Sequence, residues 1–268
     1  MAEENADYNP ENIDKSRMHP SFLNVIAQRE ELKAKLSSIK HKIGVYSAKG
    51  GVGKTTTAVN IAYALSILGY KVGLLDADID CPNITYFVGY SGTPSREYPL
   101  KPEEKNGVKI ISSGLFFEDS GKPIIWRGPM LTKMLKEFFA QTQWGELDYL
   151  IVDLSPGTSD APLTIMQLIP LDGFVLVTTP HHISAINTIK SGIMAKRFGL
   201  ALLGVVENMS DGKHFGGREV AEALGCELLG SIKQNPKMGD YSDAGLVAVL
   251  EDQAIKEEYI SIVKKFID

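Results

Sequence analysis

The sequence predicts a single-domain α/β fold in which helices cover both faces of a mostly parallel sheet. Three observations support this expectation. Short apolar segments of strand length alternate with longer segments of helical character. Several of the short segments are apolar almost throughout, as strands buried on both faces of a parallel sheet are. The chain of 268 residues contains no linker-like segment that would mark a second domain.

The N-terminal part of the chain differs in character from the rest. Residues 1–20 are polar and are expected to form a loose tail with little to bury. Residues 21–41 are expected to form a leading amphipathic helix, because their apolar side chains fall on one helical face and their charged side chains elsewhere. Residues 42–268 then form the expected globular domain.

Strand and helix patterns alternate along this domain. The predicted strands are 43–47, 72–76, 108–112, 149–154, 174–178, 203–207 and 228–232. The predicted helices are 55–68, 129–139, 183–198, 217–224 and a closing amphipathic helix at 255–267. Because ligands of such sheets bind at the carboxyl ends of the strands, the functional residues are expected at this edge.

Composition and charge argue against several classes of function. The chain carries 28 Lys and Arg against 33 Asp and Glu, a formal net charge of −5, so no broad positive surface for nucleic acid is expected. No apolar segment reaches the roughly 20 residues of a spanning helix. The closing helix lacks the basic face of a membrane anchor. The only two cysteines, Cys81 and Cys226, are far apart, which favours a reducing, cytoplasmic location.

A glycine-rich motif connects the first predicted strand to the first predicted helix. Residues 47–56, SAKGGVGKTT, follow the phosphate-binding loop pattern except that Ala48 stands at its first glycine position. Glycines let backbone N–H groups curve around phosphate oxygens, and the helix N-terminus adds positive potential. Lys54, expected in an exposed loop, would reach the β- and γ-phosphates, and the Thr55 hydroxyl would ligate Mg²⁺. The expected nucleotide-binding residues of this loop are Lys49, Gly50, Gly51, Val52, Gly53, Lys54, Thr55 and Thr56.

Acidic residues end two further strands. Asp76 and Asp78 follow the second strand, where carboxylates can hold Mg²⁺ or orient water. We assign Asp78 to the attacking water and Asp76 to the outer shell of the metal, and the reverse assignment is also open. Asp153 ends an apolar strand in the Walker B arrangement and is expected near Mg²⁺. The backbone N–H of Gly157, in the following loop, is expected to contact the γ-phosphate.

Together these residues resemble the Mrp (ApbC-type) family of deviant Walker A P-loop ATPases, of the SIMIBI class, which are iron–sulfur cluster carriers or scaffolds. The matching blocks are KGGVGKTT, DADIDCPN, IIWRGPML, WGELDYLIVDLSPGTSDAPLT, VTTPHHIS and LLGVVENMS. The resemblance implies an ATPase that forms a homodimer around ATP and Mg²⁺, in which Lys49 reaches the partner's nucleotide; a solvated loop lysine is the alternative. It implies catalytic roles for Lys49, Lys54 and Asp78. It also implies that Asn208 bonds adenine, and Pro236 is expected to cover the base.

One feature of cluster-carrying members is missing. In those members a C-P-x-C pair follows the ENMS block, whereas residues 211–218 here read DGKHFGGR. Neither Cys81 nor Cys226 has a partner at ligand spacing, and cluster sites need several thiolates. The sequence therefore does not support a bound iron–sulfur cluster, with a Cys81 pair across a dimer as the remaining alternative.

Two functions follow from these patterns. The first is an Mrp-type ATPase acting in iron–sulfur cluster assembly or transfer, with iron–sulfur apo-proteins or assembly factors as partners. The second is a ParA/MinD-like ATPase switch that positions or loads a partner protein without carrying a cluster. A small-molecule kinase is disfavoured because no separate substrate motif is present.

Overall fold

The computed structural model describes residues 20–79, 81–90, 99–113, 128–158 and 160–267, and its centre is one eight-stranded sheet. The strand order is β3-β4-β2-β5-β1-β6-β7-β8, and only β3 runs antiparallel to its neighbour. The strands are β1 (Ile39–Tyr46), β2 (Val72–Ala77), β3 (Glu103–Lys105), β4 (Val108–Ser112), β5 (Leu147–Leu154), β6 (Gly173–Thr178), β7 (Leu202–Ser210) and β8 (Leu228–Lys233). The predicted α/β fold with a mostly parallel sheet is confirmed.

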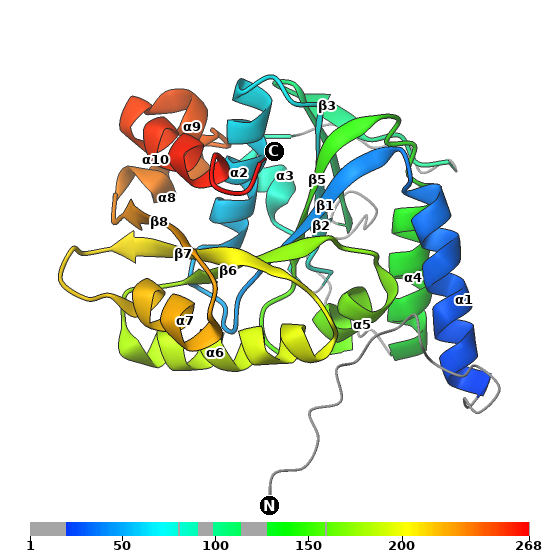
Figure 1. The fold of residues 1–268 in the computed structure, drawn as a ribbon. Coiled ribbons are helices and arrows are strands. Elements are labelled where there is room, and N and C mark those ends of the chain that lie inside the picture. Colours follow the sequence, from blue (N-terminus) through cyan, green and yellow to red (C-terminus); the bar gives the residue numbers. More distant parts are fainter. Residues whose placement is uncertain (1–19, 80, 91–98, 114–127, 159, 268) are drawn as a thin grey trace, which may run out of the picture.

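Helices cover both faces of this sheet (Figure 1). The first face carries α1 (Pro20–Lys35), α4 (Gly128–Gln141), α5 (Asp160–Leu168), α6 (His182–Arg197) and α7 (Gly216–Leu224). The second face carries α2 (Lys54–Ile67), α3 (Ile84–Phe87), α8 (Lys237–Asp243), α9 (Ala248–Glu251) and α10 (Gln253–Val263). The sheet thus separates two apolar cores, and the central strands are buried on both sides, as their continuous apolar runs require.

The strand order brings the glycine-rich loop and the acidic residues together at the carboxyl ends of the strands. β5 lies between β1 and β2, with Val45 beside Asp153 and Asp76 beside the same Asp153. Because β1, β2 and β5 are parallel, their carboxyl ends meet. The phosphate loop after β1, the acidic segment after β2 and the Walker B strand therefore converge, although they are far apart in sequence.

The leading helix is shorter than expected. It ends at Lys35, and residues 39–41, predicted as helix, are the start of β1. The reason is tertiary: Ile39 is buried and pairs with Leu147 of β5, a contact that helical periodicity cannot reveal. Leu32 and Leu36 are buried in the first-face core, so α1 packs on the domain. The predicted tail, 1–20, lies almost wholly outside the described residues.

Several short elements were not expected from the sequence. β3 is three residues long and polar, so it shows no strand pattern, and it pairs with β4 through a hairpin turn at Asn106 and Gly107. Of the short helices, α3 and α9 contact α2, α9 also contacts α10, and α8 contacts α3 and α9. Among the residues that the structure describes, no helix combines the length and apolar character needed to cross a membrane.

Candidate nucleotide-binding site

The glycine-rich segment forms a tight loop between β1 and α2. Gly51 and Gly53 have φ values of 82° and 83°, in the left-handed region that favours glycine. A Cβ on Gly53 would lie 2.0 Å from Nδ2 of Asn208, so packing also requires glycine there. A Cβ on Gly50 would meet open space. The loop is therefore shaped for close approach by phosphate, and it leads directly into the N-terminus of α2.

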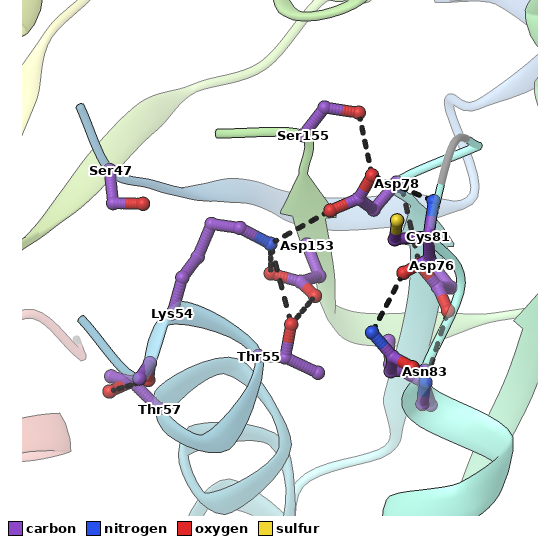
Figure 2. A network of polar contacts seen from close by, with 12 residues as sticks. Ser47, Lys54, Thr55, Thr57, Asp76, Asp78, Cys81, Asn83, Asp153 and Ser155 are labelled. Atoms are coloured by element: carbon purple, nitrogen blue, oxygen red, sulfur yellow. Dashed lines mark hydrogen bonds and ion pairs between the residues drawn. The ribbon is translucent and has the colours of Figure 1, made fainter. Parts of the chain in front are cut away.

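Lys54, Thr55 and Asp153 form the centre of the site (Figure 2). Nζ of Lys54 lies 2.5 Å from Oδ1 of Asp153 and 3.8 Å from Oδ2 of Asp78. The Thr55 hydroxyl donates to Oδ2 of Asp153 at 2.7 Å. The expectation of an exposed Lys54 is wrong, because its side chain is only 6% exposed. It opens α2 on top of the sheet, and the end of β5 lies beneath its ammonium group.

This cluster fits a magnesium ion. Thr55 supplies a hydroxyl and Asp153 a carboxylate, both oxygen ligands of the kind that Mg²⁺ prefers, and they already lie within hydrogen-bond distance of each other. Asp153 is fully buried at the end of β5, so its charge requires a cation close by. Of the three residues predicted at the metal, Thr55 and Asp153 are therefore in contact, and Asp76 is the neighbour of Asp153 across β2 and β5.

Asp76 has a different environment from the other carboxylates. Its Oδ2 accepts hydrogen bonds from the Ser112 hydroxyl at 2.9 Å and from the backbone N–H of Ile84 at 3.1 Å. Its Oδ1 accepts from the backbone N–H of Asp78. Burial, followed by the nearby charge of Asp153, raises the pKa of Asp76 to about 7. Asp76 thus ties the end of β2 to β4 and to the start of α3.

Asp78 lies closer to Lys54 and is held by fewer contacts. Its Oδ1 accepts from the Ser155 hydroxyl at 3.0 Å and from the backbone N–H of Cys81 at 3.4 Å. Burial raises the pKa of Asp78, and the positive charge of Lys54 opposes that increase. Since Oδ2 faces Lys54, this carboxylate points toward the position where a phosphate would bind on the loop.

Gly157 is close to the phosphate loop, but its N–H is already bonded. It donates to the carbonyl of Ser47 at 3.0 Å, and the Gly157 carbonyl accepts from the Tyr46 hydroxyl at 2.6 Å. Contact between this N–H and a γ-phosphate stays a prediction, and it requires the bond to Ser47 to open. Lys49 is exposed at the start of the loop, as a residue that reaches outward must be.

The two residues expected at the base have distinct settings. Asn208 is buried on β7, and its Nδ2 donates to the carbonyl of Val52 at 2.9 Å, so its amide braces the phosphate loop. Pro236 is exposed at the N-terminus of α8. Thr56 follows Thr55 in the first turn of α2 and is half-buried. The adenine contacts of Asn208 and Pro236 stay predictions.

Sequence reasoning missed the hydroxyl groups that support the site. Ser112, Ser155 and Tyr46 bond Asp76, Asp78 and Gly157 respectively. No local pattern distinguishes them from other serines and tyrosines, because each contact joins segments at least 36 residues apart. Their only sequence signal is their place at the ends of apolar strands.

The cysteines do not form a cluster site within the described residues. Cys81 is exposed and Cys226 is half-buried, and both are free thiols. Burial raises the pKa of the Cys226 thiol, which disfavours the thiolate that a metal would bind. No group of three or more His, Cys, Asp or Glu side chains in the described part of the chain could hold a metal ion. These residues therefore do not fit an iron–sulfur cluster within one protomer.

Comparison with known proteins identifies relatives of this architecture. Residues 38–267 match the ParA family described as NUBPL iron-transfer P-loop NTPase. Proteins named iron–sulfur cluster carrier protein are 40% identical in Methanocaldococcus jannaschii, over 93% of this chain and 92% of that protein, and 43% identical in Aquifex aeolicus, over 87% and 68%.

Two solved structures are also similar to this chain. A nucleotide-binding protein from Archaeoglobus fulgidus, in complex with ADP, is 32% identical with a TM-score of 0.71, covering 90% of this chain and 97% of that chain. The cell-division ATPase MinD of Pyrococcus furiosus is 20% identical with a TM-score of 0.66, covering 84% and 97%, and shows the same fold.

The buried pair of Lys54 with Asp153 predicts two effects of removing the lysine. Lys54→Ala should weaken ADP binding about 100-fold, because charge-assisted bonds to the phosphates are lost. It should also lower the free energy of unfolding by about 3 kcal/mol, because Asp153 loses its buried counter-ion. Isothermal titration calorimetry and urea denaturation measure the two effects. As a control, Lys40→Ala breaks an exposed pair with Asp148 and should change neither quantity appreciably. Unchanged ADP affinity in Lys54→Ala would contradict the assignment.

Proposed function

Because this chain belongs to the ParA family of NUBPL iron-transfer P-loop NTPases, we propose that it binds Mg·ATP, hydrolyses it to ADP and phosphate, and works as a homodimer in iron–sulfur cluster assembly or transfer. The observation that carries this proposal is the cluster of Lys54, Thr55 and Asp153 on a glycine-rich loop, with Asp78 beside it. The ADP complex of the Archaeoglobus fulgidus relative supports the choice of nucleotide. We expect this protein to act in the cytoplasm.

Each residue of the site has its own part in binding and hydrolysing ATP. The backbone N–H groups of residues 50–55 surround the phosphates, and Lys54 exchanges its bond to Asp153 for bonds to β- and γ-phosphate oxygens. Thr55 and Asp153 hold Mg²⁺, which when bound neutralises charge on the phosphates. Asp78 accepts a hydrogen bond from the attacking water and orients it toward the γ-phosphorus. The water oxygen forms a bond to the γ-phosphorus while the bond from that phosphorus to the β,γ-bridging oxygen breaks. ADP stays on the loop, and the γ-phosphoryl group leaves as inorganic phosphate with the water's oxygen, the displaced proton passing to phosphate or solvent.

Of the two carboxylates after β2, Asp78 suits the water better. Both oxygens of Asp76 already accept hydrogen bonds from the protein, and the bonds from Ser112 and Ile84 leave its Oδ2 little capacity. Oδ2 of Asp78 lies 3.8 Å from Lys54 and is turned toward the phosphate side. Asp76 then lies in the outer shell of the metal, next to Asp153, which binds the metal directly.

We further propose that Lys49 acts across the dimer. It is exposed at the mouth of the loop, whereas Lys54 is buried beneath it, so the two lysines cannot duplicate each other. An ammonium group from the partner protomer would stabilise negative charge that develops on the transferred phosphoryl group. ATP therefore favours the dimer, since this contact exists only in that state.

The role of Asp78 predicts a selective kinetic defect. Asp78→Asn should lower the turnover number about 100-fold or more while leaving Mg·ATP affinity within a few-fold, because the amide keeps the shape but loses the charge that orients water. A phosphate-release assay and equilibrium binding separate the two effects. Asp76→Asn is the matched comparison. Normal turnover in Asp78→Asn together with slow turnover in Asp76→Asn would mean that their roles are exchanged.

The role of Lys49 predicts a defect in assembly. Lys49→Ala should bind ATP with only modest loss, sediment as a monomer with a slowly hydrolysed ATP analogue, and turn over about 100-fold more slowly or worse. Sedimentation velocity of both proteins, with ADP and with the analogue, provides the measurement. Lys40→Ala removes the same charge from the amino end of β1 and should behave as wild type. A wild-type monomer under every condition would refute the trans role.

The cysteine content favours a second candidate function. The chain has only Cys81 and Cys226, and neither lies in the segment after β7, where the resemblance to the Mrp family implies a cysteine pair in cluster-carrying members. A nucleotide-gated switch that positions or loads a partner, such as an iron–sulfur apo-protein or an assembly factor, needs no bound cluster. This function uses the same ATPase site.

Anaerobic reconstitution with iron and sulfide distinguishes the two functions. We expect far less than one cluster per dimer after desalting, by iron and sulfide analysis and by absorbance, because cluster sites need several thiolates. Cys81→Ser is the matched variant. A stable cluster in wild type that Cys81→Ser abolishes would instead indicate a site shared between two protomers and would favour cluster carriage.

A further inference from the structure

The segment 155–157, between β5 and α5, is bonded to two other parts of the site. The Ser155 hydroxyl donates to Asp78 after β2, and the Gly157 N–H donates to Ser47 at the start of the phosphate loop. The Tyr46 hydroxyl, from the end of β1, donates to the carbonyl of the same Gly157. Three strand ends are thus joined through a segment of three residues (Figure 2 shows the contact of Ser155 with Asp78).

The bond from Ser155 decides how the Asp78 carboxylate is turned. Oδ1 accepts from the Ser155 hydroxyl at 3.0 Å and more weakly from the Cys81 N–H at 3.4 Å. Oδ2 is left facing Lys54 at 3.8 Å. Without the hydroxyl, the restraints left among the described residues would be the long bond from Cys81 and the 3.8 Å ion pair with Lys54, and the carboxylate could rotate more freely because terminal torsions of this kind are broad.

Ser155 itself is well placed to hold this orientation. Its side chain is 2% exposed, so water does not compete for its hydroxyl. It stands directly before Pro156, which restricts its backbone to the extended region. It also follows Asp153 by two residues, so the metal-binding carboxylate and the hydroxyl that supports Asp78 come from the same strand end. The donor is therefore fixed before any nucleotide binds.

We propose that Ser155 is a positioning residue for hydrolysis: its buried hydroxyl holds Oδ1 of Asp78, so that Oδ2 is presented to the attacking water. The proposal rests on the function proposed above, in which Asp78 orients that water. It also links water positioning to the phosphate loop, because the segment that carries Ser155 is bonded to Ser47 through Gly157. A shift of Gly157 toward a γ-phosphate would move the donor on which the orientation of Asp78 depends.

The test compares Ser155→Ala with Ser155→Thr by steady-state ATP hydrolysis. Ser155→Ala should lower kcat about 3- to 10-fold with an unchanged KM and unchanged ADP affinity, because one hydrogen bond that orients Asp78 is lost. Ser155→Thr keeps the hydroxyl and suits the extended backbone before Pro156, so it should restore kcat to within about twofold. Ser113→Ala is the control: Ser113 is buried directly after β4, and its hydroxyl makes no hydrogen bond with the described residues.

Measuring Asp78→Asn and the double variant Ser155→Ala/Asp78→Asn in the same assay tests the role of Ser155 separately from the role of Asp78. The double variant should be no slower than Asp78→Asn alone, because Ser155 acts only through that carboxylate. A wild-type kcat in Ser155→Ala, or equally slow Ala and Thr variants, would overturn the role of Ser155 while leaving Asp78 in place. Normal turnover in Asp78→Asn would instead overturn the underlying assignment of the water-orienting residue, and that of Ser155 with it.

Discussion

The buried ion pair between Lys54 and Asp153 joins the phosphate loop to the centre of the sheet, and the rest of the site is arranged around it. Lys54 opens α2, and Asp153 ends β5, the strand between β1 and β2. Neither charge could be buried alone without a cost of several kcal/mol. The requirement for pairing therefore draws the loop onto the end of β5, and it brings Thr55 within 2.7 Å of the same carboxylate. The pair thus holds together a hydroxyl and a carboxylate, oxygen groups of the kind that magnesium binds.

The other two carboxylates, Asp76 and Asp78, differ in their hydrogen-bond and ion-pair partners. Asp76 and Asp153 are neighbours across β2 and β5, and two buried negative charges at this distance oppose each other. Burial, together with this repulsion, therefore raises the pKa of Asp76 to about 7. Asp76 also accepts hydrogen bonds from Ser112 and Ile84, so it joins the end of β2 to β4 and to α3. Asp78 is less deeply buried, has one oxygen facing Lys54, and accepts a hydrogen bond from the Ser155 hydroxyl on its other oxygen. Residues of one type, aspartate, thus have separate environments in the same site.

The segment after β7 is held by hydrogen bonds between its own residues. Oδ1 of Asp211 accepts from the N–H groups of Lys213 and His214, and Oδ2 contacts the His214 ring at 2.7 Å, so this short segment is closed by its own bonds. Gly216 then packs against the carbonyl of Pro180, where a Cβ would lie within 2.7 Å. The phosphate loop and its carboxylates come instead from the ends of β1, β2 and β5. The chain thus belongs to a family described as iron-transfer P-loop NTPases although its two cysteines, Cys81 and Cys226, are far apart in the sequence.

The sequence by itself determined the fold class, seven of the eight strands, the phosphate loop and the acidic strand ends, because each is a local signal of apolar period, glycine content or charge at a strand terminus. Tertiary structure alone decided that residues 39–41 are strand and that Lys54 is buried. It also decided that Ser155 supports Asp78 and that Asn208 braces the loop at Val52. These are contacts between segments 77 and 156 residues apart in the chain. Such contacts depend on strand order and register, which no local pattern encodes, so the chemistry could be read from the sequence but its geometry could not.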